Sequence, residues 1–511
     1  MIEPAIGMYE RISPREVLLC VLGNCRIRGK CGAYMDNKIN GREAKRIFGT
    51  TRKVAMGFFL LIFVGAFILM LPISSASGEF TKPVDALFTA VTSVCVTGLV
   101  TVTTAVHWSL FGKIVIICLI QLGGLGVICC GISVLMLFKK KVDLQDRIMI
   151  QESYGLDSQM DNEVVNNGIR QGLSGYDGLI KRIVRGTFII EGIGAALLSI
   201  RFIPEFGPVK GIWYSVFHSV SAFCNAGIDI IGETSLMSYS SDPLVSLTIC
   251  FLIISGGIGF IVWWDIVRVI KAARKSRKYK NMLFKKLTLH SKIAISTTVI
   301  LIVVGTFAFF AFEYNNKATM GNAPLGDKAL MSLFQSVTTR TAGYFTIMQE
   351  NITDASYIIT LLLMIIGGSP MGTAGGLKTT TFAMIVFCVL SVVKGKKDTE
   401  AFHRRISTEN IRTGIAVITI SIITLAAAII LLTVIEPFSL EKITFESVSA
   451  IATVGLGAGM TPYMTAPGKC ILIVLMYIGR IGPITMAMAF SAKHSKTMDG
   501  IELAEKKIII G

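Results

Sequence analysis

The chain has 511 residues, of which 52% are hydrophobic and 16% charged, and its mean hydropathy is +0.65. Soluble domains are usually about one quarter charged, so this composition excludes a surface that mostly faces water, and the apolar content excludes a disordered or collagen-like chain. Eleven cysteines spread over this length exclude a small secreted disulfide scaffold. What remains is a polytopic membrane protein, which we expect to be all-α.

The net charge of +17 follows membrane topology rather than nucleic-acid binding. Of the 50 Lys and Arg residues, 39 fall in five segments: 11 before residue 54, 8 at 139–185, 10 at 268–292, 6 at 394–412 and 4 after 492. These segments alternate with long apolar regions, which is the positive-inside pattern of cytoplasmic loops. The pattern predicts a multi-pass protein in the lipid bilayer of the cell membrane, with both termini in the cytoplasm and no nucleic-acid partner.

Eight apolar runs are each close to the length of about 20 residues that crosses a bilayer core. They lie at 54–72, 113–138, 187–203, 244–267, 293–314, 356–394 with an interruption, 414–435 and 470–491. A basic segment follows every second run. The predicted unit is therefore a pair of spans with the piece between them.

This pairing divides the chain into four repeats. An N-terminal arm at 1–50 is expected to be cytoplasmic, and amphipathic or partly disordered. The repeats are expected at 51–140, 183–270, 291–394 and 412–492, the cytoplasmic linkers at 141–182, 271–290 and 395–411, and a cytoplasmic tail at 493–511.

The piece between the two spans of each repeat carries one motif. A Phe in a short apolar stretch is followed after 9 or 10 residues by a glycine. The pairs are Phe88 with Gly98, Phe217 with Gly227, Phe334 with Gly343, and Phe445 with Gly455. The stretch, 9 or 10 residues long, suffices for a half-helix that enters the membrane and stops, and the glycine permits backbone conformations that other residues resist.

Four such turns around one axis would present rings of carbonyl oxygens that replace the hydration shell of a monovalent cation. The C-terminal ends of the half-helices would add negative partial charge at the same place. The predicted ligand is K⁺. The predicted filter residues are Val96, Thr97, Gly98, Asn225, Ala226, Gly227, Thr341, Ala342, Gly343, Thr453, Val454 and Gly455.

The motifs at 97–99, 217–227, 335–343 and 453–456 resemble those of the ion-conducting subunit of the Trk/Ktr/HKT superfamily of K⁺ transporters, most of all its bacterial KtrB branch. The resemblance covers roughly residues 50–495. It implies four M1-P-M2 units (helix, pore half-helix with filter loop, helix) around a pseudo-fourfold pore, a homodimer, and a cytoplasmic RCK-type, KtrA-like nucleotide-binding ring. We expect no enzymatic activity and no cofactor bound by this chain, and the sequence leaves open whether Na⁺ acts as an activator.

The second span of each repeat carries another motif built on two adjacent glycines, and in the fourth copy Arg480 replaces the second glycine. A guanidinium at the centre of a membrane helix costs about 2.5–3.5 kcal/mol, so Arg480 is expected to act as a gate facing the pore, as a cap for loop carbonyls, or as both. In the third repeat, five glycines and a proline predict a polar loop inside the membrane at 367–381. By resemblance this loop is the gate, formed by Gly367, Gly368, Gly372, Gly375, Gly376 and Lys378 together with Arg480.

The alternative function is a coupled carrier that moves a cation with an organic solute, although four converging loops leave little room for a solute cavity. Acidic residues exceed basic ones in the predicted outer segments, which fits an acidic vestibule or ordinary solvated loops equally well. Arg340 is expected to brace the third filter loop through an acidic neighbour. Glu191 is an intramembrane carboxylate with no identified partner.

Overall fold

The computed structural model describes residues 55–126, 175–232, 234–275 and 283–482. These residues form helices joined by loops, with one antiparallel pair of two-residue strands, β1 (Glu400–Ala401) and β2 (Arg404–Arg405). The expected all-α class agrees with this mostly helical part of the chain. The arm at 1–50, the tail at 493–511, most of the linker at 141–182 and the span ends at 127–138 and 483–491 lie outside the described residues.

Each repeat begins with one apolar helix. These helices are Ala55–Met70, α10 (Gly175–Phe206), α15 (Leu289–Glu313) and α19 (Thr408–Ile435). Within the described ranges, three helices are long and apolar enough to cross a membrane by themselves: α15, α19 and the part of α10 from Lys181 to Phe206. A fourth is reached if one bent helix pair is taken as a single span.

The second helix of each repeat is short or broken. These helices are α6 (Leu110–Leu125), α12 (Pro243–Gly257) with α13 (Phe260–Lys275), α17 (Asp354–Ile365) with α18 (Thr379–Val393), and α21 (Ala466–Ile481). The run predicted as a span at 244–267 is not one straight helix, because α12 and α13 are bent by 97°. The break lies at Gly259, whose φ of 95° glycine adopts without the steric cost of a Cβ. Gly126 and Gly482 occupy the same motif position with φ of 86° and 97° and end α6 and α21.

Between the first and second helices of each repeat lies a further helix that leads into the motif glycine turn. These four helices are α4 (Pro83–Val94), α11 (Pro208–Phe223), α16 (Leu325–Thr338) and α20 (Leu440–Ala452). They are 12 to 16 residues long rather than the predicted 9 or 10, because each begins before the apolar motif. Proline in the first turn of α4 and α11 fits a helix start, where no N–H is needed.

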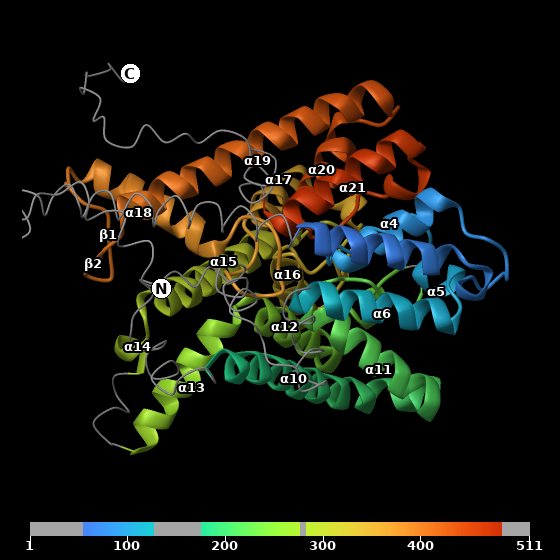
Figure 1. Ribbon diagram of the computed structural model, residues 1–511, viewed down its shortest axis with the longest axis horizontal. Helices are drawn as coiled ribbons and strands as arrows, with labels where there is room; N and C mark the ends of the chain where they lie inside the picture. The colour runs from blue at the N-terminus through green and yellow to red at the C-terminus, as the bar shows by residue number, and fades with distance from the viewer. Residues whose placement is uncertain (1–54, 127–174, 233, 276–282, 483–511) are drawn as a thin grey trace, which may run out of the picture. The chain divides into compact units, whose positions relative to one another are not determined.

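These four short helices also pack against the neighbouring repeat (Figure 1). α6 contacts α11, α12 contacts α16, α17 contacts α20, and α21 contacts α4. Because the last of these contacts joins the fourth repeat to the first, the packing forms a closed cycle. Four motif phenylalanines lie in its core, each at most 1% exposed: Phe88, Phe217, Phe334 and Phe445.

The remaining described elements are short turns of helix: η1 (Pro72–Ser74), α5 (Thr104–His107), η3 (Met237–Tyr239), α14 (Leu283–Lys286), η5 (Gln349–Asn351) and η6 (Thr461–Tyr463). The second helices begin at the capping residues Ser109, Asp242, Thr353 and Thr465, whose side chains accept from backbone N–H groups of the first turn. Each cap is also bound to the end of the first helix of its own repeat or to the turn that follows, as when Thr465 donates to Glu436 at 2.6 Å.

Four acidic side chains of the predicted outer segments are buried, and each forms a hydrogen bond or an ion pair. Glu313 and Glu436 accept from the capping threonines, and Glu446 accepts from the backbone N–H of Met460 at 2.9 Å. Asp85 forms an ion pair with Lys469. Both alternatives for the outer acidic residues are wrong for these four, because a buried carboxylate that holds a loop in place is neither a solvated charge nor part of an open vestibule.

Candidate functional site

The glycine turns of the four repeats lie against one another in one cluster. A Cβ added to Gly98 would lie 2.4 Å from the carbonyl oxygen of Ala226, too close for any side chain. The same relation links Gly227 to Ala342 O at 2.2 Å, Gly343 to Val454 O at 2.6 Å, and Gly455 to Thr97 O at 2.1 Å. The order runs from the first repeat through the fourth and returns to the first. The structure thus brings together all four turns that the sequence selected.

The backbone of the four turns repeats one unusual conformation. Two residues before each glycine, a residue other than glycine has a positive φ: Val96 at 56°, Asn225 at 61°, Thr341 at 66° and Thr453 at 52°. The glycines follow with φ between 63° and 100°. Three of the four preceding residues are β-branched, for which this region is a genuine outlier that costs about 1–3 kcal/mol each. Such strain persists where the surrounding packing imposes it, which is typical of functional sites.

A Ser or Thr four residues after the motif Phe holds each turn to its helix. Thr92 Oγ1 accepts from the N–H of Gly98 at 2.9 Å, and Ser449 Oγ accepts from Gly455 at 3.0 Å. In the other two repeats the hydroxyl donates to the residue after the glycine: Ser221 to the carbonyl of Ile228 at 2.8 Å, and Thr338 to that of Tyr344. Sequence reasoning did not assign these four hydroxyls a role, although their presence in every copy of the motif was a visible signal.

Three further hydroxyl oxygens at the turns have no hydrogen-bond partner in the described part of the chain. They are the buried Oγ1 atoms of Thr97, Thr341 and Thr453. Buried polar atoms are normally hydrogen-bonded, so each exception needs an explanation. The cluster therefore offers oxygen ligands, and an oxygen-rich surface of this kind suits a hard monovalent cation.

The interruption of the third repeat forms a loop between α17 and α18. It spans residues 366–378 rather than 367–381, because Thr379 already opens the first turn of α18. A parallel bridge between Ile366 and Leu377 closes its base. The Lys378 ammonium lies over the loop and donates to the carbonyls of Ala374 at 2.8 Å and Gly375 at 3.5 Å.

Loop glycines allow close contact with the turns and with α12. A Cβ on Gly375 would overlap Thr453 Oγ1 at 1.8 Å, and one on Gly367 would lie 3.1 Å from Thr341 Cγ2. Cβ atoms added to three other loop glycines would also lie close to backbone oxygens. The distances are 2.7 Å from Gly368 to Gly257 O, 2.8 Å from Gly372 to Gly256 O, and 3.2 Å from Gly376 to Ala452 O. The loop therefore lies directly beside the glycine turns.

Arg480 joins this loop to the first repeat. Its guanidinium donates to the carbonyl of Thr373 in the loop, and to the carbonyls of Gly123 and Gly124 at the end of α6 at 2.5 and 3.3 Å. These hydrogen bonds offset the free-energy cost of removing the half-buried guanidinium from water. One cation thereby fastens three segments that are distant in sequence.

Comparison with known proteins identifies the family. The chain matches the TrkH family, described as a cation transport protein, over residues 46–499. The chain belongs to this family. Potassium/sodium uptake protein NtpJ of Enterococcus hirae is 38% identical over 474 residues, covering 92% of this chain and 99% of that protein. Ktr system potassium uptake protein B of Bacillus subtilis is 39% identical over 447 residues, covering 87% and 93%.

The fold of this TrkH-family chain is also that of a solved structure. The crystal structure of the potassium transporter TrkH from Vibrio parahaemolyticus superposes with a TM-score of 0.60 at 14% identity, covering 85% of this chain and 83% of that chain. The predicted resemblance to the Trk/Ktr superfamily and its KtrB branch is confirmed. This TrkH-family protein is accordingly a membrane protein, and it belongs to a group of ion transporters that are not enzymes.

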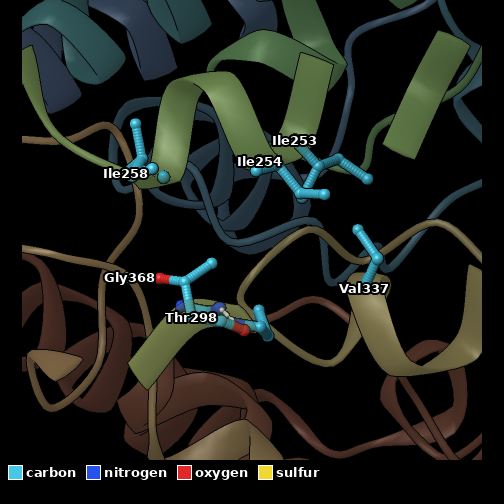
Figure 2. A pocket seen from close by; sticks show the side chains of 8 residues that line it. Ile253, Ile254, Ile258, Thr298, Val337 and Gly368 are labelled. Carbon is cyan, nitrogen blue, oxygen red and sulfur yellow. Dashed lines mark hydrogen bonds between the residues drawn. The ribbon is translucent and has the colours of Figure 1, made fainter. Parts of the chain in front are cut away.

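Two polar residues of this TrkH-family protein differ from expectation. Arg340 is 94% buried, and its guanidinium donates to the carbonyls of Thr298 and Gly367, both at 3.2 Å. The expected acidic partner of Arg340 is not found among the described residues. Beside it, Figure 2 shows a small pocket in which Ile253 and Ile254 of α12 face Val337 of α16. Glu191, for which the sequence identified no partner, accepts from Gln121 Nε2 at 3.3 Å.

Proposed function

We propose that this chain carries K⁺ into the cell through one pore formed by its own four M1-P-M2 repeats, with eight spans. The observation that supports this most directly is the cyclic meeting of four glycine turns, one from each repeat. Relatives that are more than a third identical over most of the chain are named as potassium or potassium/sodium uptake proteins. Among the helices too short to cross a membrane by themselves, α6, α17 and α21 end at the glycine motif, and α4, α11, α16 and α20 end at the turns.

In this proposal the twelve predicted filter residues coordinate K⁺ through backbone carbonyl oxygens, which replace the water shell of the ion. The C-terminal ends of α4, α11, α16 and α20 all lead into the turns, so their helix dipoles add negative partial charge where the cation binds. Influx needs no chemical fuel, because an inside-negative potential supplies about 2.3 kcal/mol per elementary charge and 100 mV.

The loop at 366–378 and Arg480 form the proposed gate. A fixed positive charge about 6 Å from a passing K⁺ raises its energy by about 3 kcal/mol at an effective dielectric constant of about 20. Arg480 is tied to the loop through Thr373, so a displacement of the loop would also release the guanidinium. The contacts of Lys378 with Ala374 and Gly375 stabilise the closed arrangement of the loop itself.

The gate is proposed to respond to a cytoplasmic RCK-type nucleotide-binding ring, with two copies of this chain in the membrane and both termini in the cytoplasm. The name "Ktr system potassium uptake protein B", carried by two relatives, speaks for a system with further components. In this proposal the chain itself binds no cofactor, and Na⁺ acts as an activator of uptake.

The test is uptake of K⁺, or of Rb⁺ as its tracer, in cells that lack their own K⁺ uptake systems. Cells producing the chain should accumulate K⁺ at external concentrations at which control cells cannot, and co-production of a regulatory ring subunit should raise the rate. Repeating the assay without Na⁺ tests the activator. Absence of K⁺ uptake with the protein present in the membrane would overturn the proposal, and uptake that depends on an organic solute would favour the coupled carrier.

A further inference from the structure

Asn225 is the one residue of the four left-handed turn positions with a carboxamide side chain; the others are Val96, Thr341 and Thr453. It is 1% exposed, and both ends of its amide are used. Oδ1 accepts from the Thr373 hydroxyl of the intramembrane loop at 3.1 Å, and Nδ2 donates to the carbonyl of Arg340 in the third turn at 3.4 Å. One side chain of the second turn therefore touches both the loop and the backbone of the third turn.

Thr373 is the loop residue at the centre of these contacts. Its hydroxyl oxygen also lies 2.9 Å from the carbonyl oxygen of Phe223, at the end of α11, so its one proton is shared between that carbonyl and Asn225 Oδ1. Its N–H donates to Gly256 O at 3.1 Å. Its carbonyl accepts from Arg480. The same residue is thus held by the cation of the proposed gate on one side and by a filter residue on the other.

Asn225 suits this position for a conformational reason as well. Asn tolerates the left-handed region better than most residues, and its φ is 61°. Arg340, whose carbonyl receives the amide, uses its own guanidinium to hold Gly367 at the start of the loop. Two independent contacts therefore run from the loop to the second and third turns, at Thr373 and at Gly367.

We infer that Asn225 and Thr373 couple the position of the loop to the shape of the ion filter, so that discrimination between K⁺ and Na⁺ depends on whether the loop is closed. The inference rests on the proposed function, since it assigns a second role to the loop of that pore. When the loop leaves, Asn225 Oδ1 loses its donor, and the amide that positions the third turn is free to rotate. Asn225 acts here as a positioning residue, through the carbonyl of Arg340.

The experiment compares variants by two separate readouts: maximal K⁺ flux, and the ratio of the Na⁺ and K⁺ concentrations that half-saturate uptake. Thr373→Val removes the hydroxyl, Thr373→Ser keeps it, and Asn225→Gly removes the amide while tolerating the positive φ. A hydrogen bond contributes about 0.5–1.5 kcal/mol, so we expect Thr373→Val and Asn225→Gly each to lower the ratio by about 2- to 12-fold, and Thr373→Ser to leave it near the wild-type value.

Two comparisons separate coupling from simple opening. Ser369→Ala removes a contact within the loop, Ser369 Oγ to Thr379 Oγ1 at 2.8 Å, that does not reach the filter; it should change flux but not the ratio. The double variant of Asn225→Gly with Thr373→Val should change the ratio by less than the sum of the two single effects, because each single variant already removes the contact between the two side chains. If Thr373→Val is not recovered in the membrane, Thr373→Ala removes the same hydroxyl.

The inference is overturned if Thr373→Val changes flux while the ratio stays within twofold of wild type, or if the two single effects add in the double variant. Its failure is distinct from failure of the proposed function. Wild-type protein that takes up no K⁺ overturns the function, whereas wild-type uptake with an unmoved ratio in Thr373→Val overturns only the coupling.

Discussion

Lys469 of α21 donates to Asp85 of α4 at 2.8 Å, and this ion pair joins the fourth repeat to the first. Each side chain is only 12% exposed. The pair lies where the chain closes its cycle of packing contacts, between two segments separated by 384 positions in the sequence. No local signal in the sequence links the two residues, yet each has the charge that the other requires.

Replacing Lys469 by Met should destabilise the protein by about 1–3 kcal/mol, because it leaves a poorly hydrated carboxylate without its cation. The measurement is the thermal unfolding midpoint in detergent. Asp85→Asn combined with Lys469→Met should lose less than the sum of the two single variants, since the second change removes the charge that the first left unpaired. Additive losses would show that the two side chains do not interact.

Gly98→Ser should weaken K⁺ binding. Its Cβ would lie 2.4 Å from the backbone of Ala226, and the φ of 100° is strained for any residue with a side chain. Strain of about 1–3 kcal/mol at the turn corresponds to a rise of about 5- to 150-fold in the K⁺ concentration that half-saturates uptake. The control is Gly326→Ser in the first turn of α16, where an added Cβ meets nothing within 4 Å. An unmoved K⁺ affinity in Gly98→Ser would remove the first turn from the filter.

Gly256→Ala should be far more damaging than Gly192→Ala, although both glycines lie in helices. A Cβ on Gly256 would lie 1.8 Å from the carbonyl oxygen of Phe223, whereas one on Gly192 in α10 meets nothing within 4 Å. We expect a loss of about 1–3 kcal/mol or more at Gly256 from overpacking, and no loss at Gly192, where alanine favours the helix by about 1 kcal/mol. Equal unfolding midpoints would contradict the close approach of α12 to α11.

The sequence predicts which residues form the four turns, because the motif that marks them is short and local. A Phe and a glycine 9 or 10 residues apart, four times, select the turns that the structure brings together. The sequence could not predict the conformation two residues earlier, since Val96, Thr341 and Thr453 are β-branched and local preference opposes a positive φ there. Tertiary packing imposes that conformation.

The helix breaks were missed for a related reason. Gly259 stands within an apolar run of spanning length, and hydropathy alone does not distinguish a glycine that ends a helix from one that admits a neighbour. In the same motif Gly256 allows the close approach of α11, and Gly259, three residues later, lies at the helix break. Long-range contacts such as Asn225 with Thr373 leave no periodic signal at all, because they join residues 148 positions apart.

Deleting Gly372–Gly376 should raise K⁺ flux and weaken its dependence on a regulatory partner. The deleted segment holds Thr373, which receives Arg480, and the carbonyls that receive Lys378. Its loss therefore shortens the loop and removes the carbonyls that hold Arg480 and Lys378 in place. The measurement is the initial rate of Rb⁺ uptake per amount of protein in the membrane, with and without the partner. Unchanged or lost flux in a correctly folded deletion variant would contradict a gating role.

Arg480→Gln tests the charge of the gate while leaving the loop intact. A fixed charge that raises the energy of a passing ion by about 3 kcal/mol slows conduction by more than tenfold, so its removal should raise flux by about tenfold or more. Arg201→Gln is the matched control, because Arg201 is 45% exposed and pairs with Glu205 and Asp242 away from the loop; its flux should equal that of wild type. Equal fluxes in all three proteins would leave Arg480 as a cap for the carbonyls of Thr373, Gly123 and Gly124, with no electrostatic barrier to K⁺.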